Sequence, residues 1–94
     1  MVKIVWTKTA LIDLKNIFYY VAKDSKYYAT RLVERIIDAV EQLENFPKSG
    51  RIVPEKNDET IREIIFGNYR IFYKMVSQNK ISILRIHHSA KNVK

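Results

Sequence analysis

The spacing of apolar residues changes along the first half of the chain, and the changes mark separate elements. Residues 2–6 alternate in the manner of a short β-strand. From residue 7 to about 23 the apolar positions recur at helical spacing, at Ala10, Leu14, Ile17, Phe18 and Val21. The stripe repeats over about 26–46, at Ala29, Leu32, Val33, Ile36, Val40 and Leu43. The pattern predicts a strand followed by two amphipathic helices.

The two predicted helices are separated by a very short link. Asp24 and Ser25 end the first helix, and Ser25 can cap the second by accepting a hydrogen bond from a free backbone N–H. So short a link predicts an antiparallel hairpin. The run Pro47-Lys48-Ser49-Gly50 ends the second helix, because proline cannot continue the helical bonding and glycine permits a turn.

The second half of the chain is typical of strands. A polar loop over 51–60 precedes three stretches rich in Ile, Val, Phe and Tyr, at 61–66, 69–76 and 80–87. Gly67-Asn68 and Ser77-Gln78-Asn79 separate them at hairpin length. The sequence therefore predicts an α+β fold in which an N-terminal strand and a helix hairpin precede a three-stranded antiparallel meander. The helices cover one face of the sheet and leave the other open to a partner.

The period of two predicts which strand residues lie on the open face. In the middle strand of the meander, Ile71, Tyr73 and Met75 form the better core set, so Arg70, Phe72 and Lys74 point outward. In the last strand, Leu84 and Ile86 are the expected core pair, with Ile83, Arg85 and His87 outside, although Ile81 and Ile83 compete for the inside. We therefore expect Arg70, Arg85 and His87 to share one open surface.

Composition limits the kind of protein this can be. The 94 residues suffice for a single domain spanning 1–94, and the 47% apolar fraction is too high for intrinsic disorder. The absence of cysteine excludes disulfides and thiolate zinc sites, and the two histidines are adjacent. We expect no metal and no cofactor. With no long apolar segment and no signal peptide, we expect a cytoplasmic protein without a membrane partner.

Charge is distributed unevenly along the chain. The net charge is +7, and after Glu63 the sequence holds six basic residues and no acid. Such an imbalance creates a positive field that favours a polyanionic partner, either nucleic acid or an acidic protein.

Several segments, in their order and spacing, resemble the RelE/ParE superfamily of bacterial type II toxin–antitoxin toxins. The resemblance runs over nearly the whole chain and is closest to the ParE-type, or plasmid-stabilisation, branch. It is sharpest in the segments 46–51, 54–55, 62–63, 67–73 and 83–88. It implies a small basic toxin that inhibits growth until a cognate antitoxin neutralises it.

The superfamily contains two activities. The ParE-like branch acts on DNA gyrase, whereas RelE-like members are ribosome-dependent endoribonucleases that cut mRNA. A third possibility, from binding physics alone, is a non-toxic nucleic-acid-binding module. That class ranks last because the sequence lacks helix-turn-helix, zinc-finger and aromatic RNP patterns.

Candidate residues for the ribonuclease activity can be carried over from the resemblance. Metal-free RNA cleavage needs a base, an acid and cationic donors to the phosphorane. Glu55 falls where some relatives carry a catalytic carboxylate, Arg70 matches a phosphate-binding arginine, and His87 matches a C-terminal histidine. His88 stands where those relatives have a functional tyrosine, and residues 89–94 contain no aromatic side chain. These departures favour the gyrase-directed activity.

Some of the same residues are candidates for contact with a partner or with nucleic acid. This set comprises Arg51, Arg62, Arg70, Lys74, Arg85 and His88. Structural roles are the alternatives: Arg70 can pair with Glu63 across strands, and Arg51 can bond the last carbonyls of the second helix. Tyr69 and Tyr73 are expected in the core, and one of Tyr27 and Tyr28 is expected to stay exposed as an anchor for a partner.

Overall fold

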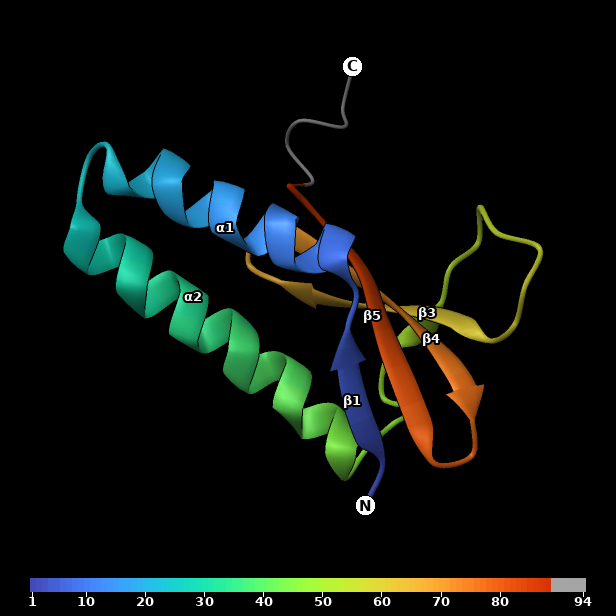
Figure 1. Ribbon diagram of the computed structural model, residues 1–94. Coiled ribbons are helices and arrows are strands. Elements are labelled where there is room, and N and C mark those ends of the chain that lie inside the picture. Colours follow the sequence, from blue (N-terminus) through green and yellow to red (C-terminus); the bar gives the residue numbers. More distant parts are fainter. Residues whose placement is uncertain (89–94) are drawn as a thin grey trace.

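The structure is a computed structural model, and it describes residues 1–88. In chain order, the elements are β1 (Lys3–Trp6), α1 (Lys8–Ala22), α2 (Lys26–Glu41), a 3₁₀ turn (Gln42–Glu44), β2 (Arg51–Ile52), β3 (Ile61–Phe66), β4 (Tyr69–Ser77) and β5 (Lys80–His88). Figure 1 shows α1 and α2 lying antiparallel beside the strands. The predicted α+β architecture, with a helix hairpin followed by an antiparallel meander, is confirmed.

The strands form one mixed sheet in the order β1-β5-β4-β3-β2. β1 runs parallel to β5, and the remaining neighbours are antiparallel. β2 lies inside the segment that the sequence predicts as a loop, and its two residues are too few to show an alternating pattern. It adds an edge strand beside β3, which brings Arg51 opposite Glu63.

The helix boundaries follow from local capping. The Thr7 hydroxyl accepts a hydrogen bond from the Ala10 amide at the start of α1. The Ser25 hydroxyl accepts one from the Tyr28 amide at the start of α2, which confirms the predicted cap. The second helix ends earlier than predicted, at Glu41, and the chain tightens into the 3₁₀ turn before Pro47.

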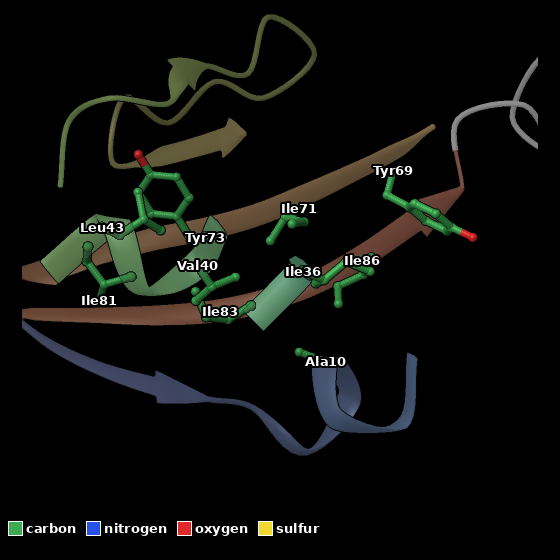
Figure 2. Close-up of a cluster of buried hydrophobic side chains, with 10 residues drawn as sticks. All are labelled: Ala10, Ile36, Val40, Leu43, Tyr69, Ile71, Tyr73, Ile81, Ile83 and Ile86. Carbon is green, nitrogen blue, oxygen red and sulfur yellow. The ribbon is translucent and has the colours of Figure 1, made fainter. Parts of the chain in front are cut away.

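The core lies between the hairpin and the inner face of the sheet. Figure 2 shows its buried side chains, which are Ala10, Ile36, Val40, Leu43, Tyr69, Ile71, Tyr73, Ile81, Ile83 and Ile86. Tyr69 and Tyr73 are among them, as expected. Met75 packs against the same cluster, so the predicted orientation of β4 is correct.

The predicted orientation of β5 is wrong at Ile83 and Leu84. Ile83 is fully buried in the core, whereas Leu84 is only partly buried and lines a hollow on the other face. The cause is a β-bulge: Phe72 pairs with Arg85 and the next residue, Tyr73, pairs with Ile83, so Leu84 is the extra residue. A bulge breaks the period of two on which the prediction rested.

Gly50 lies where the backbone passes close to a buried tyrosine of the core, Tyr73. A Cβ atom there would approach the Glu63 carbonyl and the Tyr73 hydroxyl oxygen to 2.6 Å each. That hydroxyl accepts a hydrogen bond from the Gly50 amide (3.0 Å) and donates one to the Pro47 carbonyl (2.8 Å). The absence of a side chain at Gly50 therefore allows the turn after the second helix to pack against the Tyr73 hydroxyl.

We expect Gly50→Ala to lower the free energy of unfolding by about 1–3 kcal/mol, the usual cost of overpacking. Ser49→Ala, at the exposed neighbouring position, should change it by less than about 0.5 kcal/mol. Urea denaturation followed by circular dichroism measures both variants. Equal midpoints for Gly50→Ala and the wild type would contradict the packing seen at this turn.

Candidate functional site on the outer sheet face

A buried carboxylate, that of Glu63, organises the sheet face opposite the helices. Ile64 and Phe66 pack against the core, so the alternation of β3 points Glu63 to the other face. The residue is nevertheless only 1% exposed. Its two oxygens accept hydrogen bonds from Nε of Arg51 and from Nε of Arg70, the latter at 2.6 Å. Two guanidinium groups thus compensate one buried charge.

Arg70 lies between two carboxylates. Besides the bond from its Nε to Glu63, its Nη2 donates to Glu55 at 3.2 Å and 3.4 Å. The guanidinium also lies over the Phe72 ring, 4.9 Å from its centre. The hydrogen bond with Glu63 is the main cause that raises the pKa of Arg70. The cross-strand pairing of Arg70 with Glu63, one of the two alternatives for this residue, is present.

Glu55 is the solvent-facing member of this network, with 60% of its side chain exposed. A backbone hydrogen bond lowers the pKa of its carboxyl, and the hydrogen bond from Arg70 lowers it further. Glu55 is therefore ionised at neutral pH and holds one side of the Arg70 guanidinium.

His87 lies next to Arg70 across the β4–β5 pair. Its ring packs edge-on against Phe72, with the ring centres 5.3 Å apart. Burial is the largest cause that lowers the pKa of His87, and the positive charges of Arg85, Arg70 and Lys56 lower it further, against an opposing effect of Asp13. His87 is therefore neutral at physiological pH.

The lowered pKa of His87 predicts a specific acid sensitivity. Because the folded state binds the proton less readily than the unfolded state, stability is complete above the ordinary pKa of 6.5 and falls as the pH drops through the folded-state pKa. We expect the urea midpoint of the wild type to decrease as the pH is lowered from about 7.5 to about 5, a range that lies above the ordinary pKa values of carboxyl groups. His87→Gln should show a smaller fall, and identical slopes would contradict the assignment.

Helix α1 fixes the bulged part of β5. The Asp13 carboxylate accepts hydrogen bonds from the Ile86 amide (3.0 Å) and from Arg85 Nε (2.8 Å). The Thr7 hydroxyl donates to the Leu84 carbonyl (3.1 Å). These contacts bond backbone groups of β5 beyond Ile83, where its pairing with β1 ends, and an ion pair links Arg85 to the helix.

The outer face is hollowed next to Arg70. The hollow has a volume of about 510 Å³, and Glu55, Arg70, Arg85 and His87 line it together with the apolar side chain of Phe72. The structure thus brings together the three candidate ribonuclease residues. It also confirms that Arg70, Arg85 and His87 reach one surface.

The other candidate residues have separate surroundings. Arg51 bonds Glu63, so the expectation that it bonds the carbonyls of the second helix is wrong. Arg62 donates a hydrogen bond to the Gly50 carbonyl at 2.7 Å, in the turn that follows the second helix. Lys74 lies 3.8 Å from Asp58, and His88 packs edge-on against Tyr69. Residues 89–94, whose lack of an aromatic side chain entered the prediction, lie outside the described residues.

Two important residues were not among the predicted site residues. Glu63 was considered only as a partner for Arg70, although a single acid inside an apolar strand, on the same face as Phe72, is a readable signal. Asp13 gave no such signal, because its role depends on contacts with Arg85 and Ile86, far away in the sequence. Within residues 1–88, no group of three or more His, Cys, Asp or Glu side chains could hold a metal ion.

The length and polarity of the helices α1 and α2 bear on whether either could cross a membrane. Over the described part of the chain, no helix has the length and apolar character needed to cross a membrane.

Comparison with known proteins identifies the class. The family described as the ParE toxin of the type II toxin–antitoxin system parDE matches residues 4–93. The chain is 31% identical over 91 residues to the toxin RelE2 of Caulobacter vibrioides, covering 97% of this chain and 99% of that one. This chain therefore belongs to the ParE toxin family, within the RelE/ParE superfamily of type II toxin–antitoxin toxins.

Solved structures agree with this assignment. The chromosomal ParDE toxin–antitoxin system of P. aeruginosa matches with a TM-score of 0.76 and 25% identity, covering 94% of this chain and 96% of that one. The RelBE2 toxin–antitoxin complex of Mycobacterium tuberculosis has the same fold, with a TM-score of 0.69 at 20% identity and coverage of 93% and 96%.

Proposed function

We propose that this toxin inhibits growth by acting on DNA gyrase in the cytoplasm, and that a cognate antitoxin neutralises it. Membership of the ParE family supports the target, since the ParE-like branch is the gyrase-directed one. That solved relatives are toxin–antitoxin complexes supports the antitoxin. The observation that carries the choice of target is the engagement of Arg70 by two carboxylates.

RNA cleavage requires the guanidinium of Arg70 to be available to a phosphate. A phosphate-binding arginine offers its planar set of donors to the phosphorane. Here Nε is bonded to buried Glu63 and Nη2 to ionised Glu55. A phosphate approaching Arg70 would also meet the negative charge of Glu55. A protein partner, by contrast, can contact this neutralised, ordered surface without displacing either carboxylate.

The state of His87 favours the same conclusion. A general acid in RNA cleavage must carry a proton to the leaving 5′-oxygen. Burial and neighbouring positive charges lower the pKa of His87, so little of the protonated form is present at neutral pH. The functional tyrosine of the ribonuclease relatives is also replaced here by His88.

The second candidate function is ribosome-dependent mRNA cleavage. One observation favours it: Glu55, Arg70 and His87 line a single hollow on the outer face. In this function Glu55 would take the 2′-hydroxyl proton, Arg70 would hold the phosphate and His87 would supply a proton.

The variants Glu55→Gln and His87→Gln separate the two functions. If gyrase is the target, both should inhibit purified gyrase in a supercoiling assay within about twofold of the wild type, as expected for residues outside the contact hot spot. Codon-dependent cleavage on translating ribosomes should be absent. Cleavage by the wild type that falls about 10²-fold in either variant would instead assign the ribonuclease function.

A further inference from the structure

A second hollow lies at the other side of the molecule, on the helix hairpin. It has a volume of about 500 Å³ and lies where α1 ends, α2 begins and the β3–β4 turn approaches. Leu32 and Phe66 contribute apolar surface, and Tyr27 and Tyr28 stand beside it. Figure 1 shows that this end of the hairpin projects beyond the strands. The hollow is therefore separate from the surface around Arg70.

The tyrosines at this hollow are unusually exposed. Tyr27 and Tyr28 are 68% and 67% exposed, and their rings pack edge-on with centres 5.9 Å apart. Tyr19 and Tyr20, at the end of α1, are also mostly exposed. One of Tyr27 and Tyr28 was expected to stay exposed as an anchor for a partner, and both are exposed. Exposed aromatic side chains grouped in this way are typical of protein contact sites.

Arg31 and Arg35 supply the charge of the hollow. They lie four residues apart on α2, one turn of the helix, and both are exposed. Neither forms an ion pair with any residue of the described chain, and no acidic residue lines the hollow. This arrangement differs from the outer face, where Arg51, Arg70 and Arg85 are all paired with carboxylates.

We infer that this hollow is a docking site for an acidic segment of the cognate antitoxin. The segment carries two carboxylates about one helical turn apart, which meet Arg31 and Arg35, and an apolar side chain that enters between Tyr28 and Phe66. The inference rests on the proposed toxin–antitoxin function. It adds the location of the contact and the chemistry of the bound segment.

Charge complementarity and residue type favour this occupant. Unpaired arginines beside an apolar hollow attract carboxylates and bind them bidentately. Tyrosine and arginine are also the residues that most often carry the binding energy of stable interfaces. A segment that folds on binding can supply acids and apolar anchors together. Because the site lies apart from Arg70, the antitoxin can hold the toxin here without contacting the network of Glu55 and Glu63.

The test uses the full toxin and the protein encoded by the adjacent reading frame, with overlapping 15-residue peptides of that protein as probes. The charge-reversal variant Arg31→Glu/Arg35→Glu should bind the partner at least tenfold more weakly in titration calorimetry. Its binding should also depend less on salt concentration. The control Lys3→Glu/Lys80→Glu changes the net charge equally at exposed positions of β1 and β5 and should bind within threefold of the wild type.

Two further measurements make the result specific. A photo-crosslinking residue at position 28 should label an acidic segment of the partner, and one at position 80 should not. In cells, the Arg31→Glu/Arg35→Glu toxin should remain toxic and escape neutralisation by the partner. Changing the acids of the labelled segment to lysine should restore neutralisation of this variant. Unchanged affinity in the charge-reversal variant, or failure of the adjacent protein to bind wild-type toxin, would overturn the inference.

The outcome is independent of the choice of toxin target. If the wild-type toxin does not inhibit gyrase, and Arg31→Glu/Arg35→Glu still weakens binding of the partner, only the gyrase proposal is refuted. Loss of gyrase inhibition in that variant with unchanged partner binding would place the hollow at the target interface and overturn the docking inference.

Discussion

Replacing Glu63 with alanine is expected to lower the free energy of unfolding by about 3–5 kcal/mol, the cost of removing one partner from a buried ion pair. The Glu63 side chain is fully buried, and both of its oxygens accept hydrogen bonds from arginines. Removing it leaves Arg70, with 19% of its side chain exposed, without its closest counter-charge. A domain of this size has a total stability of roughly 5–15 kcal/mol, so the variant should be near the limit of folding.

The matched control is Glu55→Ala, which removes the other carboxylate bound to Arg70. Because 60% of the Glu55 side chain is exposed, its ion pair should contribute no more than about 1 kcal/mol. Urea denaturation of both variants at neutral pH measures the difference. If Glu63→Ala and Glu55→Ala lose equal stability, burial of Glu63 is not what holds the outer face together.

The sequence predicted the fold well because most of its elements are locally consistent. Ser25 caps a helix, Gly67-Asn68 forms a hairpin turn, and the buried Ile71 and Tyr73 alternate with residues that point away from the core, so each choice agrees with the final structure. The resemblance to a known family covered the same elements in the same order. The first helix, the meander and the orientation of β4 were all correct.

The errors in the predicted side-chain positions arose at a bulge in β5 and at the short edge strand β2. At Leu84 the bulge in the pairing of β4 with β5 shifts the alternation of β5, and the Ile86 amide beyond it bonds Asp13, far away in the sequence. At Arg51 the two-residue strand β2 redirects the side chain to Glu63. Both features depend on contacts between distant segments, which a local pattern does not contain.

The candidate site was predictable as a surface but not as a network. Alternation placed Arg70 and His87 on one face, and the structure agrees. The pattern could not predict the burial of Glu63, the bonding of Arg70 to two carboxylates or the lowered pKa of His87. These states decide between a catalytic surface and a contact surface, because a general acid and a phosphate ligand must both be available to the substrate.

Arg70→Ala is expected to abolish growth inhibition while the antitoxin still binds. In the gyrase-directed function, Arg70 itself contacts the target, and its guanidinium lies over the Phe72 ring of the same surface. Loss of an interface arginine of this kind typically costs about 2 kcal/mol of binding, so inhibition of purified gyrase should weaken about 30-fold or more. Arg51 still compensates Glu63 in this variant, so it should fold.

Arg70→Lys is the informative companion, because lysine keeps the charge but cannot donate from a planar fork to two carboxylates. We expect it to recover only a small part of the inhibition. Lys80→Ala, at an exposed position outside the network, should act like the wild type at equal expression. Antitoxin binding and a thermal melt verify folding for each variant. Full toxicity of Arg70→Ala at equal expression would remove Arg70 from the functional surface, whichever target the toxin has.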